Sequence, residues 1–255
     1  MNIEIAVSCT WFQRRLCWMM SSCLQQDPLQ DGSPVPDLTF SVAYPPRNGR
    51  PTTEEVCDFF GGLGLRVKRF PYPDERAIQF RGLVRNRQLA ESTADWMLFS
   101  DSDMVYSRQF FATLAVRLAG DLKDETRCIS ASRVSLDKDK SKRFFNEEDD
   151  TVYPSLVDGC AAKVSTWPVF QISRNCGAGY FQLVNVAAVR CLHGGLYVEP
   201  GECKDEAEFD SYHKTRSDSQ FRSRVGGLKR IELPPQYHLN HERDNEEGRH
   251  ITMQR

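Results

Sequence analysis

The triplet Asp101-Ser102-Asp103 offers the clearest chemistry in this chain, because it places two carboxylates one residue apart. The apolar run directly before it, residues 96–100, has the length and composition of a buried strand. In open α/β sheets, ligands bind beyond the carboxyl ends of the strands. Two carboxylates at that place can hold a hard divalent cation, and the cation can hold a diphosphate. The triplet therefore predicts a metal and diphosphate site at a strand end.

A second triplet, Asp137-Lys138-Asp139, shows that the pattern alone is weak. It lies in a polar stretch with no strand before it, and this context is typical of acids on a solvated loop. The triplet at 101–103 differs from the second triplet in its position, directly after an expected buried strand. Two like charges at a strand end are costly unless something positive lies between them.

Length and composition indicate one sizeable domain. The chain has 255 residues, 40% of them hydrophobic, and a net charge of −2 that neither requires nor excludes a polyanionic partner. Its nine cysteines include no Cys-x-x-Cys pair. The amino terminus has no signal-peptide pattern, and no apolar run is long enough to span a membrane. We therefore expect a cytoplasmic protein with reduced, buried thiols.

The elements that must position the first triplet alternate along the chain. Strands are expected over residues 3–8, 38–44 and 65–70, before the strand at 96–100. Helices are expected over 14–25, from a capping box at Thr52 to about residue 61, and from Asp74 through Arg87. This order predicts an α/β fold with a mostly parallel central sheet flanked by helices.

The second half of the chain is less regular. A helix is expected over 110–118, a strand over 128–134, and a turn at 177–179 that leads into a buried strand. Four basic residues followed by four acids predict a flexible charged loop at about 137–150. Either a mobile solvated loop or a lid that orders over substrate would explain that composition.

Three segments together resemble the GT-A fold glycosyltransferases, above all the large inverting family that uses nucleotide-diphosphate sugars. Residues 81–90 followed by 96–103 are similar to its helix bearing Ala-Arg-Asn, its apolar strand and its Asp-x-Asp motif. Residues 217–224 resemble its Glu-Asp-x-Glu-Leu-x-x-Arg segment, and residues 237–244 resemble a late metal-binding histidine segment. The resemblance implies a single Rossmann-like GT-A domain over 1–255, with a nucleotide-sugar-binding half at 1–105 and an acceptor-binding half at 106–255.

The resemblance also implies a metal site and a general base. Asp103, with Asp101 acting directly or through water or the ribose, would bind Mn²⁺ or Mg²⁺ together with His238 or His241. For each histidine, a hydrogen-bonded or surface side chain is the alternative. Asp218 would take the proton from the acceptor hydroxyl, or it is simply an acid favoured at a helix N-terminus.

Further residues would contact the nucleotide sugar. The expected set is Thr10, Trp11, Arg85, Asp101, Ser102 and Gly179, the last with its neighbours Gly177 and Ala178 lining the sugar and acceptor pocket. Trp11 would stack on the nucleotide or pack in the core. The guanidinium of Arg85 suits a phosphate, a pair with Asp101 or a structural salt bridge equally well.

Two departures from the family pattern affect these assignments. Tyr44-Pro45-Pro46-Arg47 stands where many relatives carry an Asp that reads the nucleotide base, so the base is open, with a UDP-sugar favoured. Ser217 and Gln220 replace two family acids beside Asp218, whose assignment depends on position more than on a full motif.

The resemblance thus implies a metal-dependent hexosyl transferase that uses a nucleotide sugar and inverts the anomeric centre. The acceptor is a glycan, a small molecule, or hydroxymethylcytosine in phage DNA, and basic clusters at 138–143 and 222–230 keep DNA open. A nucleotidyltransferase is disfavoured because no glycine follows the first strand over residues 8–14. A non-catalytic nucleotide-binding module is the third class.

Overall fold

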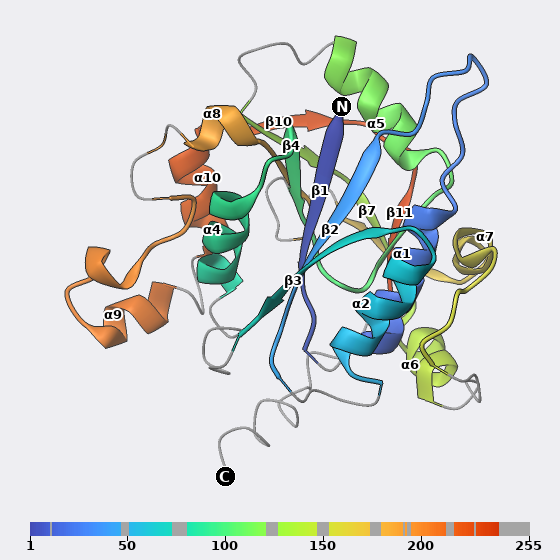
Figure 1. Ribbon diagram of the computed structural model, residues 1–255, viewed down its shortest axis with the longest axis horizontal. Coiled ribbons are helices and arrows are strands. Elements are labelled where there is room, and N and C mark those ends of the chain that lie inside the picture. Colours follow the sequence, from blue (N-terminus) through green and yellow to red (C-terminus); the bar gives the residue numbers. More distant parts are fainter. Residues whose placement is uncertain are drawn as a thin grey trace.

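The structure is a computed structural model in which two sheets and their helices form the fold (Figure 1). It describes residues 1–10, 12–46, 51–72, 81–120, 127–146, 153–173, 180–190, 192, 195–212, 217–226 and 228–239.

A seven-stranded sheet runs through the centre in the order β10-β6-β9-β4-β1-β2-β3. Its strands are β1 (Asn2–Ser8), β2 (Asp37–Tyr44), β3 (Arg66–Pro71), β4 (Trp96–Phe99), β6 (Cys128–Ala131), β9 (Gln182–Asn185) and β10 (Leu228–Ile231). Neighbouring strands are parallel except at β9, which is antiparallel to both β4 and β6. The predicted mostly parallel sheet is confirmed, and the carboxyl ends of β1, β2 and β4 lie at one edge.

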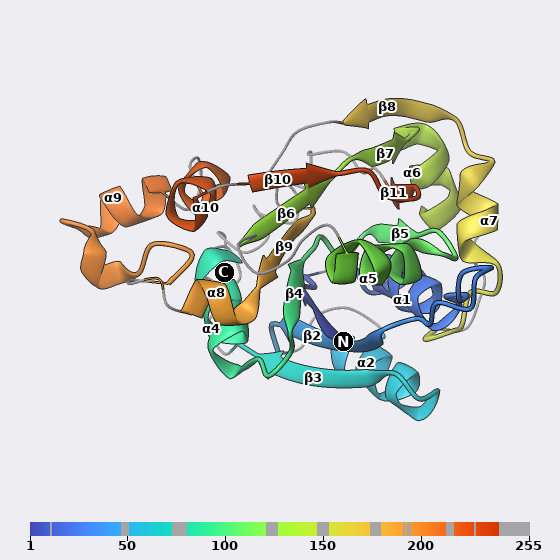
Figure 2. The ribbon, with the colours of Figure 1, turned by 90° about the horizontal axis from the view of Figure 1, so that it is seen from above.

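Helices cover both faces of this sheet (Figure 2). One face carries α1 (Gln13–Leu24), α2 (Thr53–Gly62) and α5 (Phe110–Gly120), and the other carries α4 (Arg81–Glu91), α8 (Val186–Arg190) and α10 (Ser217–Val225). Alternation along each strand supplies both cores, since Leu98 packs in the first and its neighbours Met97 and Phe99 pack in the second. The predicted capping box of α2 is present, with Glu55 N donating to Thr52 Oγ1 at 3.2 Å.

A second, four-stranded sheet in the order β5-β11-β7-β8 was not predicted. Its strands are β5 (Met104–Tyr106), β7 (Arg133–Leu136), β8 (Val169–Ser173) and β11 (Gln236–His238). The strand predicted at 128–134 is wrong as a single element. It divides at Ser132 into β6 and β7, because the chain leaves the large sheet there and enters the second one.

The second triplet, expected to have no strand before it, directly follows β7, so that expectation is wrong. The segment at 137–150, predicted as a charged loop, is helical over α6 (Lys138–Asn146). Asp137 explains the difference, because its Oδ1 accepts from Lys140 N at 2.8 Å and its carbonyl accepts from Ser141 N at 3.1 Å. An aspartate in this position satisfies backbone donors of the first turn. The predicted lid role concerns residues 147–150 as well, which lie outside the described residues.

The remaining elements are α7 (Cys160–Ser165), the 3₁₀ turn η1 (Pro200–Glu202) and α9 (Glu206–Ser211). Six of the seven cysteines within the described ranges are buried, as predicted. None of the helices built from described residues combines the length and the apolar character needed to cross a membrane.

Candidate active site

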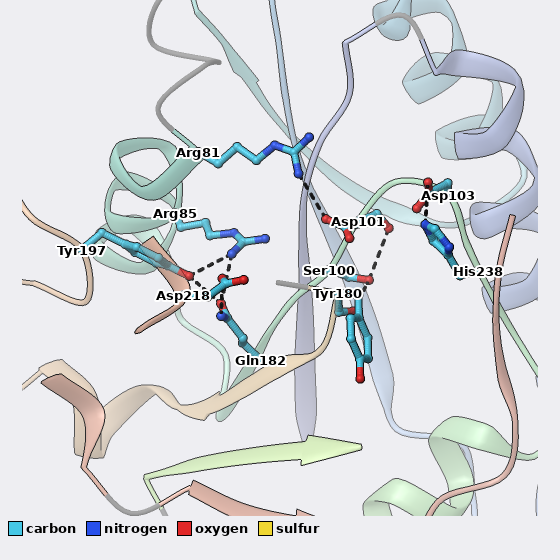
Figure 3. A network of polar contacts seen from close by, with 10 residues as sticks. All are labelled: Arg81, Arg85, Ser100, Asp101, Asp103, Tyr180, Gln182, Tyr197, Asp218 and His238. Carbon is cyan, nitrogen blue, oxygen red and sulfur yellow. Dashed lines mark hydrogen bonds and ion pairs between the residues drawn. The ribbon is translucent and has the colours of Figure 1, made fainter. Parts of the chain in front are cut away.

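The Asp101–Asp103 triplet lies between β4 and β5, where the chain passes from the large sheet to the second one (Figure 3). Ser100, which is 2% exposed, holds the end of β4 in place. Its Oγ donates to the Tyr180 carbonyl at 3.1 Å and lies 2.9 Å from the Tyr106 hydroxyl. Since a serine has a single proton to donate, the Tyr106 hydroxyl is the donor in the second contact. These buried bonds fix where the triplet begins.

Asp103 and His238 lie side by side and are called the Asp103 pair below. The distance from His238 Nε2 to Asp103 Oδ2 is 3.2 Å, and both side chains are largely buried. Antiparallel pairing of β5 with β11 sets His238 opposite Met104, and Leu239 N donates to the Asp103 carbonyl at 2.9 Å. Strand pairing therefore brings together two residues far apart in the sequence.

A half-buried arginine lies within electrostatic reach of the Asp103 pair. Burial lowers the pKa of Arg15, on α1, and attraction to the Asp103 carboxylate opposes that shift. The Asp103 carboxylate therefore contacts an imidazole and also interacts electrostatically with a guanidinium.

The Asp103 pair has the chemistry and spacing of two ligands of a divalent cation. Neighbouring ligands of an octahedral ion bound at about 2.1 Å lie roughly 3 Å apart, close to the separation seen here. A carboxylate with one imidazole suits Mn²⁺ or Mg²⁺. No group of three or more His, Cys, Asp or Glu side chains within the described ranges is placed to hold a metal. Such ions commonly complete their shell with water and substrate phosphates. His241 lies outside the described residues.

Asp101 forms an ion pair with Arg81, and sequence reasoning gave Arg81 no role. The distance from Arg81 Nη1 to Asp101 Oδ1 is 3.4 Å, and the Asp101 side chain is 25% exposed. Arg81 and Arg85 lie four residues apart on α4 and so face the same way. That spacing is the signal that identifies Arg81, which lies one turn closer to the helix start.

Arg85 is buried, 6% exposed, and donates inward. Its Nη1 donates to Gln182 Oε1 at 3.0 Å and to the Tyr197 hydroxyl at 2.8 Å. Burial works to lower the pKa of Arg85, but Tyr197, Asp101 and Asp218 together raise it above its usual value. The guanidinium therefore stays charged within reach of both aspartates.

Asp218 lies in the first turn of α10 and accepts a hydrogen bond from Gln182 Nε2 at 3.0 Å (Figure 3). Asp218, Gln182, Arg85 and Tyr197 are called the Asp218 network below. Gln182 lies opposite Phe99 at the carboxyl end of β4, which brings the network to the same sheet edge as the triplet. Sequence reasoning missed Gln182. The available signal was a polar residue inside an otherwise apolar, strand-like run.

Asn86 fixes the segment that carries Tyr197. Its Oδ1 accepts from Leu196 N at 3.1 Å and from Tyr197 N at 3.0 Å, while its Nδ2 donates to the Tyr197 carbonyl at 2.8 Å. The approach is close enough that a Cβ at Gly195, where φ is +68°, would lie 3.0 Å from Asn86 Nδ2. Arg85 and Asn86 thus hold the same segment. Arg85 bonds to the side-chain hydroxyl of Tyr197, and Asn86 bonds to the backbone of Leu196 and Tyr197.

The other predicted contacts are only partly placed. Thr10 is half-buried just beyond β1, at the same edge, where Cys9 N donates to the Ala43 carbonyl at 2.8 Å. Ser102 is 5% exposed within the triplet. Trp11 and residues 177–179 lie outside the described residues. Nucleotide binding by these residues stays a prediction.

Comparison with known proteins gives a likeness in structure and none in sequence. No family model matches this chain, and no curated protein matches its sequence. S. aureus TarS matches 93% of the chain with a TM-score of 0.60 and 11% identity. TarS 1-349 in complex with UDP-GlcNAc matches 96% with a TM-score of 0.57 and 11% identity. The mannosyltransferase PcManGT from Pyrobaculum calidifontis, in complex with GDP-Man and Mn²⁺, matches 97% with a TM-score of 0.50 and 15% identity.

The chain has a GT-A fold. It spans 36% of the first TarS chain and 59% of each of the other two chains. At these identities the likeness establishes the fold, and it confirms the GT-A architecture predicted from the sequence. In the GT-A fold of this chain, the Asp103 pair and the Asp218 network share the carboxyl edge of the large sheet.

Proposed function

We propose that this chain is a metal-dependent glycosyltransferase that moves a sugar from a nucleotide-diphosphate sugar to an acceptor hydroxyl. The observation that carries the proposal is the Asp103 pair, a carboxylate and an imidazole 3.2 Å apart at the carboxyl edge of a GT-A sheet. Similar folds are solved with UDP-GlcNAc and with GDP-Man and Mn²⁺, which supports a nucleotide sugar as donor and a divalent cation beside it. A UDP-sugar is the favoured donor.

Asp103 and His238 would hold Mn²⁺ or Mg²⁺. A divalent cation at this place stabilises the negative charge that develops on a departing nucleoside diphosphate. Arg81 offers a second positive charge, since its guanidinium is largely exposed beside Asp101. A guanidinium there can pair with phosphate oxygens when the donor binds. Once Arg81 pairs with phosphate, the Asp101 carboxylate would be able to contact the ribose or to join the ligands around the cation.

Asp218 would act as the general base in a single displacement. The acceptor oxygen forms a bond to the anomeric carbon while the bond from that carbon to the diphosphate breaks. The hydroxyl proton passes to Asp218, and the electron pair of the broken bond leaves with the nucleoside diphosphate. Attack from the face opposite the leaving group inverts the anomeric centre. Asp218 is partly exposed, so an acceptor hydroxyl can come within hydrogen-bond reach of its carboxylate.

The test is a donor screen with a matched control. Purified protein, Mn²⁺ and a panel of nucleotide sugars are monitored for released nucleoside diphosphate. Oligosaccharides, small alcohols, and duplex DNA with and without hydroxymethylcytosine serve as acceptors. We expect one nucleotide sugar to be consumed with Mn²⁺ and not with EDTA. Asp103→Ala should abolish the release, while Asp139→Ala, at an exposed position of the second triplet, should not.

Two outcomes contradict the proposal. One is wild-type protein that consumes no nucleotide sugar with any divalent cation and acceptor in the panel. The other is an Asp103→Ala variant that matches Asp139→Ala in rate. Transfer to modified but not to unmodified duplex would identify DNA as the acceptor, and transfer to an oligosaccharide alone would exclude it.

A further inference from the structure

Gln182 is a fully buried amide at the carboxyl edge of the large sheet, 0% exposed. A buried amide is costly unless its oxygen and its nitrogen both find hydrogen-bond partners. Here the oxygen meets Arg85 and Tyr197, and the nitrogen meets Asp218. Gln182 therefore connects α4, through Arg85, to the proposed base on α10.

The chemistry of the partners fixes which way the amide points. A guanidinium has donors only, so the atom of Gln182 that faces Arg85 must be the oxygen. The NH₂ group is then turned toward Asp218, which accepts when it is ionised. The donor that meets Asp218 Oδ1 is thus a neutral amide.

Tyr197 completes an arrangement of protons that is consistent with these contacts. Burial raises the pKa of Tyr197 to about 12, and the nearby charge of Arg85 opposes that rise. The phenol therefore keeps its proton at neutral pH. Its oxygen accepts from Arg85 Nη1 at 2.8 Å and its hydrogen goes to Gln182 Oε1 at 2.5 Å.

We propose that Gln182 is a positioning residue that orients the Asp218 carboxylate for proton abstraction. A hydrogen bond to the charged form of a carboxylate favours that form. A bond from a neutral amide does so less strongly than a bond from a guanidinium, because charge-assisted hydrogen bonds are roughly twice as strong. Donation by the amide thus fixes one oxygen of the Asp218 carboxylate in place. The inference rests on the proposed function, in which Asp218 is the base.

Gln182→Glu separates this role from a purely structural one. The new carboxylate still accepts from Arg85 and Tyr197, so the buried contacts that support the fold remain. It no longer donates to Asp218 and adds a like charge beside it. A pair of adjacent carboxylates holds a proton to higher pH than one carboxylate does.

We expect three results for Gln182→Glu. At pH 7, kcat falls by about 10-fold to 100-fold, a part of the 10²-fold to 10⁴-fold that a general base supplies. The acidic limb of the pH–rate profile moves to higher pH by about one unit or more. The donor KM and the melting temperature stay close to wild type. Gln30→Glu, in an exposed turn before β2, is the matched control for the added charge and should change none of these.

The inference is overturned if Gln182→Glu keeps the wild-type kcat and pH profile while Asp218→Asn is inactive. If Asp218→Asn retains full transfer, the base assignment fails and this inference fails with it. A second readout needs no turnover, because the ¹³C resonance of the Asp218 carboxyl reports its titration directly. Its midpoint should lie at higher pH in Gln182→Glu than in wild type. An unchanged midpoint would refute the positioning role even if the donor screen failed.

Discussion

The Asp103 pair and the Asp218 network each bring a carboxylate to the same sheet edge, and they differ in what faces it. Asp103 faces an imidazole nitrogen, which can share a cation with the carboxylate. Asp218 faces an amide donor that is backed by Arg85. The first arrangement favours binding of a metal ion, and the second orients a carboxylate through a hydrogen bond. The difference indicates how one site can stabilise a leaving group and deprotonate an acceptor separately.

The largest expected effect comes from Asp218→Asn, which should remove the base and leave the metal site intact. Asparagine keeps the size of the side chain and an oxygen that accepts from Gln182. We expect kcat to fall by about 10²-fold to 10⁴-fold. Binding of Mn²⁺ and of nucleoside diphosphate, followed by calorimetry, should be unchanged. A loss of Mn²⁺ affinity comparable to the loss of rate would show that the two carboxylates act as one unit.

Raising the pH should weaken the core beneath the Asp103 pair. That core contains Met104, next to Asp103, together with Cys9 and Cys57. Burial is the main cause that raises the pKa of Cys9 to about 11 and of Cys57 to about 12. The folded state therefore holds these protons more tightly than the unfolded state, whose thiols titrate near pH 8.5. This stabilisation is fully present below about pH 8.5 and is lost as the pH rises toward 11 and 12.

We expect the free energy of unfolding to fall by about 2 kcal/mol for each of these thiols between pH 8 and pH 10. Urea denaturation at the two pH values measures it. A Cys9→Ala, Cys57→Ala double variant is the comparison and should show a smaller fall. Equal pH dependence in the double variant and the wild type would show that other groups are responsible.

Asn86→Ala should act on the Asp218 network alone. The substitution leaves the backbone N–H groups of Leu196 and Tyr197 without the acceptor that they have now. We expect a loss of about 2 kcal/mol in the free energy of unfolding. Ser165→Ala, at an exposed position, is the control and should change stability by less than about 0.5 kcal/mol. Mn²⁺ binding should survive in Asn86→Ala, and its loss would mean that the two regions are coupled.

Arg81→Ala should have the smallest effect on stability. The Arg81–Asp101 pair is exposed, and pairs of this kind contribute less than about 1 kcal/mol. Arg87→Ala, which removes an exposed pair with Glu91 from the same helix, is the matched control. The two variants should unfold at similar urea concentrations. If Arg81→Ala lowered the free energy of unfolding as much as Asn86→Ala does, the Arg81–Asp101 pair would have to stabilise the fold itself.

Local sequence patterns predicted the first half of the fold. The strand before Asp101 is a short apolar run, and the start of α2 has a capping box that depends only on residues three apart. The position of Asp218 in the first turn of α10 likewise depends only on residues near it in the sequence. The segment at 137–150 was misjudged, because its charges suggested a loop and a single aspartate cap supports a helix there.

The contacts that complete the site depend on strand pairing between distant segments. His238 reaches Asp103 because β11 pairs with β5, and these strands of three residues each are too short to show a period. Gln182 reaches Asp218 because β9 enters the large sheet antiparallel, in a register that sets it opposite Phe99. A slip of one residue would turn the side chain to the other face. No local pattern specifies that register.

The central claim is that a divalent cation binds at Asp103, and titration of Mn²⁺ in the presence of nucleoside diphosphate tests it most directly. Wild type, Asp139→Ala and Asp218→Asn should bind the ion with the same affinity. Asp103→Ala should bind at least about 100-fold more weakly, since it removes a direct ligand. Equal affinity in Asp103→Ala and Asp139→Ala would contradict the account.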